Sequence, residues 1–168
     1  MSASRRRMGV YERALERFGR SSPGNWFLTR IAPRIDPTLL RISGGRFSSA
    51  YPVPVMLLTT TGAKTGLPRQ LPLLYTSDGD SLILVASNYG RSGHPAWYRN
   101  LTANPRVEVL AGRHRGSYTA SEITDLAERE DAWAKALDLY AGYGDYEARA
   151  GGRKIPLIRL RRSASPHS

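Results

Sequence analysis

The feature that most limits the fold is a series of short apolar runs, which begins near residue 53 and is broken repeatedly by glycine and proline. Asp78-Gly79 and Gly112 are turn signals between neighbouring runs, as in β-hairpins. Pro68 and Pro72 favour a sheet edge or a bulge for the second run, because proline cannot donate a backbone hydrogen bond. Few helical patterns intervene, so the chain is predicted to be mainly β with flanking helices (α+β) and to form a small antiparallel barrel of about six strands. The expected strands cover residues 53–60, 69–76, 81–86, 106–110, 115–122 and 155–160.

Two segments within this series have the pattern of helices. Residues 95–103 are expected to form a short helix, with a proline near its start and Asn104-Pro105 at its end. Residues 125–140 are expected to form a longer helix, for which Thr124 is the predicted N-cap. The predicted buried stripe of this longer helix consists of Leu126, Trp133, Leu137 and Tyr140.

The first fifty residues are basic and amphipathic. Apolar residues recur at positions 8, 11, 15 and 18, which is one face of a helix whose other face carries arginines. Short helices are also expected over residues 26–31, stopped by Pro33, and over 36–42, ended by Gly44-Gly45. The first helix either lies on an anionic membrane or packs on the barrel or on a second subunit. We therefore expect a helical segment at 1–50, the barrel domain at 51–162 and a disordered tail at 163–168.

The composition limits the classes of partner. The net charge of +11 favours an acidic partner, namely nucleic acid, an anionic membrane surface or a polyanionic small molecule. The absence of cysteine excludes disulfides, a thiolate nucleophile and Fe–S sites, and three scattered histidines have no metal-ligand spacing, so no metal is expected. No apolar run approaches the ~20 residues that span a bilayer, and no secretory signal is evident. We expect a cytoplasmic protein, and peripheral attachment to the inner face of the membrane stays open.

The turn between the first two expected strands carries both charge and hydrogen-bond donors. Residues 59–69 read TTTGAKTGLPR and include the cations Lys64 and Arg69. Such a turn can direct backbone N–H groups and two cations at one point, which suits a phosphate or polycarboxylate group. It is not a Walker A loop, because the G-x-x-x-x-G-K-[ST] order is absent and the segment that follows has the pattern of a strand. An ordinary β-turn with solvated charges is the alternative.

A second stretch makes the pattern more specific. Residues 86–88 read ASN, residues 94–105 read HPAWYRNLTANP, and tyrosines repeat every three residues from 140 to 146. Together with the first turn, and in this order, these motifs resemble the deazaflavin-dependent nitroreductase and quinone reductase family over roughly residues 31–162. The resemblance implies a split β-barrel like that of FMN-binding oxidases. It also implies the cofactor coenzyme F420, a 5-deazaflavin with a ribityl phosphate and an oligoglutamate tail.

The resemblance also implies a set of cofactor contacts. The first turn would hold the phosphate and the tail, residues 86–88 would lie against the deazaflavin ring, and the helix near residues 96–100 would close the pocket. Family members usually have Arg or Lys where this chain has Ala63, and Arg41 or Arg46 is a candidate replacement. For Trp97 the alternative is a core position, for Asn100 it is helix capping, and His94 is expected to shape its loop. The implied contacts are Leu57, Leu58, Thr59, Ala63, Lys64, Thr65, Gly66, Leu67, Pro68, Arg69, Ala86, Ser87, Asn88, Ala96, Trp97, Tyr98, Arg99, Asn100 and Tyr143.

The resemblance places the catalytic group at Ser87, Tyr140, Tyr143 and Tyr146. Reduced deazaflavin would give a hydride to a stacked quinone, nitroaromatic or similar acceptor, and Ser87 or a tyrosine hydroxyl would stabilise charge on the acceptor oxygen. For the tyrosines, an aromatic core stripe is an equally good explanation from spacing alone. Gly142 and Gly144 are expected to interrupt the helix, so that the segment acts as a mobile lid.

Other functions remain possible at this point. An FMN-dependent oxidoreductase on the same barrel would use the cationic turn for one phosphate. A nucleic-acid-binding protein is compatible with the charge but lacks interleaved exposed aromatics, so no specific nucleic acid is expected. A membrane-binding module is compatible with the enzyme if the acceptor is lipid-soluble. A homodimer is a further possibility, because split barrels often pair across the sheet.

Overall fold

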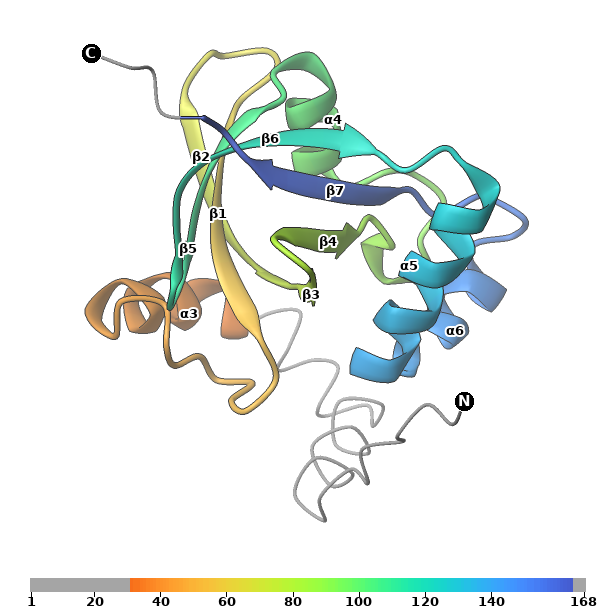
Figure 1. Cartoon of the computed structure of the whole chain (residues 1–168), viewed down its shortest axis with the longest axis horizontal. Coiled ribbons are helices and arrows are strands. Elements are labelled where there is room, and N and C mark those ends of the chain that lie inside the picture. Colours follow the sequence, from red (N-terminus) through yellow and green to blue (C-terminus); the bar gives the residue numbers. More distant parts are fainter. Residues whose placement is uncertain (1–30, 165–168) are drawn as a thin grey trace.

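The structure is a computed structural model that describes residues 31–164. Its centre is one antiparallel sheet with the strand order β2-β1-β5-β6-β7-β4-β3 (Figure 1). β2 and β3 stand at opposite edges of this order, yet only Tyr75 separates them in the chain. The sheet must therefore curl until its two edges meet, which makes it a barrel. The predicted small antiparallel barrel is confirmed.

The sheet has seven strands rather than the expected six. The strand expected over 69–76 is divided, because the chain leaves one edge of the sheet after Leu74 and joins the opposite edge at Thr76. Pro72 does lie in an edge strand, as its missing donor predicts. The strands are β1 Val55–Thr61, β2 Pro68–Leu74, β3 Thr76–Asp78, β4 Ser81–Val85, β5 Arg106–Ala111, β6 His114–Glu122 and β7 Leu157–Arg162.

The barrel interior is the main core. Strand residues alternate between the two faces of the sheet, and those that point inward are almost fully buried. Helix α4 (Ala96–Ala103) contributes Trp97 and Leu101 to the same cluster, so Trp97 occupies the core position that was its alternative explanation. The inward side chains of the strands include Met56, Leu58, Leu82, Leu84, Val107, Tyr118, Ile158 and Leu160.

Helix α3 (Ala32–Ile42) packs on the outside of β1. Leu40 contacts Val55 and Leu57, and the buried Asp36 accepts hydrogen bonds from the backbone and side chain of Ser49, which ties the following loop to the helix. Pro33 lies in the first turn of α3, where a missing N–H costs nothing. The helix expected over residues 1–20 lies outside the described residues, as does most of the one expected over 26–31.

Helices α5 (Leu126–Leu139) and α6 (Gly142–Arg149) cover the other outer face, over β4 and β7 (Figure 1). β4 is therefore buried on both faces, which explains its uninterrupted apolar sequence. The predicted N-cap is wrong by one residue, since Asp125 rather than Thr124 accepts the hydrogen bond from the N–H of Glu128. The buried stripe is also different: Leu126 is 72% exposed, and Ala132 and Ala136 are the buried residues of α5.

A charged network joins α5 to the sheet. Asp78 of β3 is bound by Lys135 of α5 and by Arg159 of β7, and Arg159 also donates to Glu128 at 2.8 Å. The hydrogen bonds from Lys135 and Arg159 hold the pKa of Asp78 below its ordinary value. The network fixes the helical layer through ion pairs as well as apolar contacts. Within residues 31–164, no helix has both the length and the apolar character that crossing a membrane requires.

Candidate functional site

The β1–β2 loop, residues 62–67, is built by its own backbone. The N–H of Gly62 donates to Leu67 O at 2.9 Å, and the N–H of Gly66 donates to Gly62 O at 2.8 Å. Gly66 has a φ of +68°, a left-handed conformation that glycine adopts at low cost. A Cβ on Gly62 would lie 2.7 Å from Thr65 Oγ1, so this glycine lets the loop close on itself. The resulting turn is compact and needs few contacts from the rest of the molecule.

The loop presents unpaired positive groups. Lys64 and Arg69 are exposed and form no ion pair with any residue between 31 and 164. The backbone N–H groups of Lys64 and Thr65 likewise have no acceptor in the part of the chain that the structure describes. Two cations and two free backbone donors on one exposed turn match the chemistry of a phosphate or carboxylate group. The loop therefore fits the anionic part of the implied cofactor.

Asn100 of α4 joins this loop to the barrel. Its Oδ1 accepts from the N–H of Ala63 at 3.0 Å, and its Nδ2 donates to Thr60 Oγ1 at 3.1 Å. The capping role considered for Asn100 is wrong, because its side chain bridges from the helix to the strand and the loop. The amide side chain thus holds the N-terminal half of the loop in place.

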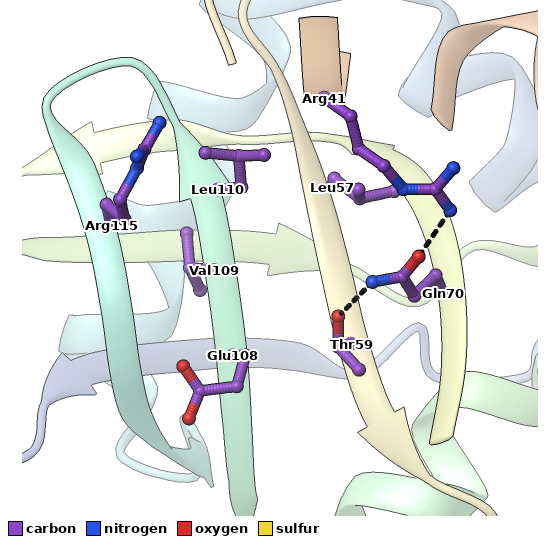
Figure 2. Close-up of a pocket in the computed structure, with 8 residues that line it drawn as sticks. All are labelled: Arg41, Leu57, Thr59, Gln70, Glu108, Val109, Leu110 and Arg115. Atoms are coloured by element: carbon purple, nitrogen blue, oxygen red, sulfur yellow. Dashed lines mark hydrogen bonds between the residues drawn. The ribbon is translucent and has the colours of Figure 1, made fainter. Parts of the chain in front are cut away.

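A shallow pocket lies on the outer face of the sheet, beside the same strands (Figure 2). It encloses about 380 Å³, and its side chains come from α3, β1, β2, β5 and β6. Arg41 donates to the side chain of Gln70, which donates in turn to Thr59 Oγ1 at 3.1 Å (Figure 2). The lining residues are Arg41, Leu57, Thr59, Gln70, Glu108, Val109, Leu110 and Arg115.

Strand alternation divides the expected contacts of β1 between two faces. Leu57 and Thr59 line the outer pocket, whereas Leu58 is fully buried inside the barrel. The side chain of Leu58 therefore contacts no ligand in this conformation. Arg41, a candidate replacement for the missing cation at Ala63, lies in the outer pocket beside Thr59. Sequence spacing alone did not separate the two faces.

The second motif forms a loop after β4 that includes the short 3-10 helix η1 (Asn88–Gly90). Ser87 is buried, and its hydroxyl makes no capping bond to η1. Asn88 and Tyr89 have φ angles of +50° and +57°, and Gly90 has +75°. Two consecutive non-glycine residues in the left-handed region are unfavourable, so contacts from elsewhere must hold this turn.

These contacts come chiefly from Arg153, between α6 and β7. Its guanidinium donates to the carbonyl oxygens of Ser87 at 2.9 Å and Arg91 at 3.1 Å, and it lies 3.2 Å from His94 Nδ1. No local pattern indicates Arg153 as a site residue, because it lies in a Gly-Gly-Arg-Lys segment that has the pattern of a solvated turn. Only the fold brings it to the motif.

The expected contacts on α4 have different surroundings. Ala96 and Arg99 are exposed, and Arg99 donates to His94 O at 3.2 Å. Tyr98 donates its hydroxyl to Glu122 at 2.8 Å, and burial together with this carboxylate raises the pKa of Tyr98. Ala86 is fully buried beside the core, so only its backbone is open to a ligand contact.

The three tyrosines form one aromatic cluster. Tyr140 lies 5.3 Å from Tyr143 and 6.0 Å from Tyr146 between ring centroids, and the latter two are buried. Burial raises the pKa of both Tyr143 and Tyr146, so their hydroxyls stay protonated. Tyr89 of η1 joins the cluster, 6.0 Å from Tyr146. The cluster is thus an aromatic core in this conformation, and any contact of Tyr143 with a cofactor requires α6 to shift.

The expectation that glycines interrupt this segment is wrong. Gly142 and Gly144 both lie in helix α6. A Cβ on Gly142 would lie 2.3 Å from the ring of Tyr140, so this glycine makes room for the aromatic ring instead of breaking the helix. Tyr140 itself caps the preceding helix, which means that the three tyrosines come from two helices.

Helix α4 connects the two parts of the candidate site. Its Asn100 holds the β1–β2 loop, and its first turn contacts His94 of the second loop. Gly90 of η1 packs against Tyr146, so the second loop also contacts the tyrosine cluster. Helix α4 therefore contacts both the exposed cationic loop and the loop that packs on the buried aromatic cluster.

Comparisons with known proteins show the family to which the chain is similar. A sequence profile described as F420H(2)-dependent quinone reductase matches residues 32–161. An F420H(2)-dependent quinone reductase of Mycobacterium tuberculosis (strain ATCC 25618 / H37Rv) is 38% identical over 136 residues, which are 77% of this chain and 89% of that protein. Its counterpart from Mycobacterium bovis (strain ATCC BAA-935 / AF2122/97) has the same identity and coverage.

Two solved structures are also similar. One, an F420-H2 dependent reductase (FDR-A), is 37% identical, with a TM-score of 0.57, and the match covers 64% of this chain and 94% of the other. A second, described as a domain-swapped dimer, is 33% identical, with a TM-score of 0.60, and the match covers 83% of this chain and all of the other. The split-barrel fold that the motifs implied is confirmed.

Proposed function

The chain belongs to the F420H(2)-dependent quinone reductase family, and we propose that it binds reduced coenzyme F420 and reduces a quinone. The observation that carries this proposal is the β1–β2 loop, where the side chains of Lys64 and Arg69 and the backbone N–H groups of Lys64 and Thr65 have no partner among residues 31–164. FMN, the other cofactor considered, has one phosphate and no oligoglutamate tail. The family favours F420 over FMN.

Some residues of the site bind the cofactor, and others orient the loop or the acceptor. Lys64 and Arg69 bind the phosphate and the tail, and Asn100 keeps the loop at the right distance from the barrel. When bound, the reduced deazaflavin supplies the hydride. Ser87 has a hydroxyl that caps nothing, so it is free to donate a hydrogen bond to the acceptor oxygen as that oxygen gains negative charge. The buried, protonated tyrosines would exclude water from the ring once α6 has shifted to admit it.

The acceptor and the partners are proposals that go beyond family membership. Quinones are the first acceptor class, and nitroaromatics, which are also flat and conjugated, are the second. A homodimer is supported by the domain-swapped neighbour. The membrane contact of residues 1–20 lies outside the described residues and stays a prediction.

Titration of the purified protein with F420 tests the proposal, with FMN in parallel and tryptophan fluorescence as the signal. We expect saturable binding of F420 only. Lys64→Ala and Arg69→Ala should each weaken binding roughly ten-fold, because a charged hydrogen bond contributes about 1.5–3 kcal/mol. Ala63→Arg should strengthen it, since this restores the cation that family members usually have there.

Arg113→Ala is the matched control, because Arg113 is an exposed arginine in the β5–β6 turn. Equal weakening by Arg113→Ala and Arg69→Ala would mean that overall charge, and not the loop, attracts the cofactor. Binding of FMN without F420 would overturn the proposal.

A further inference from the structure

The loop after β4 has a backbone that it cannot maintain alone. Asn88, Tyr89 and Gly90 all lie in the left-handed region, and the first two are not glycine. Three hydrogen bonds lie within the loop: Asn88 Nδ2 donates to Gly93 O at 3.0 Å, and the N–H groups of Gly90 and Arg91 donate to Ser87 O at 3.0 Å and Asn88 O at 3.1 Å. The two backbone bonds only close the left-handed turn itself and do not tie it to the rest of the fold, so a group outside the loop is needed to hold this strained conformation in place.

Arg153 is that group. Its guanidinium spans the loop, with Ser87 O on one side of the left-handed turn, and Arg91 O and His94 Nδ1 on the other. Gly151 and Gly152, with φ angles of +63° and +82°, turn the chain at the end of α6 so that the arginine points back toward the loop. All of the hydrogen-bond partners of its guanidinium within residues 31–164 belong to this one loop.

The same contact fixes the state of His94. A guanidinium only donates hydrogen bonds, so Nδ1 of His94 must be the acceptor, and the ring proton is on Nε2. The imidazole packs against Tyr98 of α4, with ring centroids 4.8 Å apart. Arg153 therefore positions the start of α4 as well as Ser87.

The guanidinium is also partly unsatisfied, since Arg153 Nε is buried without a partner in the described structure. A buried donor without an acceptor is unfavourable, so the three contacts of the guanidinium with the loop have to offset this cost.

We propose that Arg153 is a positioning residue, which holds Ser87 and His94 in their working geometry and couples α6, with its tyrosines, to the cofactor pocket. The proposal rests on the proposed function, because Ser87 matters only if the acceptor binds beside it. It predicts a division of effects: loss of Arg153 disturbs the chemical step, whereas the phosphate-binding loop, which Asn100 holds, stays intact.

The experiment measures kcat and KM with F420H2 and menadione, the thermal midpoint, and hydrogen exchange over residues 87–95, all in the full-length protein. Arg153→Ala should lower kcat at least ten-fold, change KM for F420H2 less than two-fold and increase exchange in the loop. Arg153→Lys should recover part of kcat, since an ammonium reaches one or two of the acceptors. Arg113→Ala is the matched control and should leave all of these values unchanged.

His94 supplies a second test that does not depend on the folding of the alanine variant. The side-chain oxygen of Asn occupies the place of Nδ1, so His94→Asn keeps an acceptor for Arg153, whereas His94→Gln places its amide near Nε2. We expect His94→Asn to keep more activity than His94→Gln. Equal losses in these two variants, or wild-type kcat and exchange in Arg153→Ala, would overturn the proposal.

Failure of the two proposals can be distinguished. If the wild-type protein neither binds F420 nor reduces menadione with F420H2, the proposed function fails. Hydrogen exchange then decides whether Arg153 holds the loop, and unchanged protection of residues 87–95 in Arg153→Ala would refute that as well.

Discussion

The two motif-bearing loops of this protein are stabilised in different ways. The β1–β2 loop is exposed, closes through its own backbone and has one anchor, Asn100, on the barrel. The loop after β4 is pressed against α6 and depends on Arg153, which is distant in sequence. The first loop is therefore held mainly by local contacts and presents positive charge. The conformation of the second loop depends instead on tertiary contacts. An exposed turn of this kind can bind an anionic tail without a large desolvation cost. The more buried loop is suited to aligning a flat ring.

The largest expected effect comes from adding one methyl group to the second loop. In Gly90→Ala, the new Cβ would lie 2.8 Å from Tyr146 O and 3.1 Å from Tyr146 Cα, in a left-handed residue. Strain and overpacking together should lower the free energy of unfolding by about 3 kcal/mol. Urea unfolding measures this change.

Gly66→Ala is the matched substitution in the first loop. Gly66 has a similar φ, +68°, but no atom of the described residues outside its immediate neighbours lies within 4 Å of the position of an added Cβ. Only the backbone strain remains, so the expected loss is about 1 kcal/mol. Equal losses at the two glycines would show that the loops do not differ in packing, and the comparison would fail.

A smaller effect is expected for Asn100→Ala. This change removes the hydrogen bonds to Thr60 and Ala63, at about 1 kcal/mol each, so unfolding should become about 1–2 kcal/mol easier. Hydrogen exchange should increase in residues 62–67 and not in residues 87–95. Thr102→Ala is the control on the same helix, because among residues 31–164 the Thr102 hydroxyl bonds only to Tyr98 O within α4. Faster exchange in both loops would contradict the separate anchoring.

Acidification should give the smallest effect, confined to the α5–α6 side. The pKa of Asp78 is lowered in the folded state, so the stability that Asp78 contributes is present above about pH 4 and is lost as the pH falls through its lower folded value. The Asp78 side chain is 21% exposed, so solvent partly screens its ion pairs. In a series of thermal midpoints from pH 3 to pH 6, Asp78→Asn should vary less steeply than the wild type. An identical slope for the two proteins would exclude Asp78 as a source of the acid sensitivity.

Much of the fold followed from local patterns. Short apolar runs, the Asp78-Gly79 turn and Gly112 determine hairpins, because strand alternation and turn chemistry are properties of neighbouring residues. The division between β2 and β3 was missed because nothing at Tyr75 marks a change of sheet edge. The N-cap and the buried face of α5 were missed because the partner surface, not the helix, decides which face is covered.

The candidate site was predictable to a similar degree. The charged turn and the motif order were visible in the sequence, and they led to the family. Whether a residue of β1 lines a pocket or the core depended on register, which separates Thr59 from Leu58. The tyrosine spacing predicted a cluster, but on one interrupted helix instead of two.

The sequence by itself determined where most strands lie along the chain, the chemistry of the β1–β2 turn and the family, since each of these depends on residues close together in the chain. Only the tertiary structure decided how the sheet closes, which side chains are buried and what holds the loop after β4. Arg153 lies 66 residues from Ser87 in the chain. A contact between residues so far apart arises from the packing of α6 on the barrel, which no local pattern encodes.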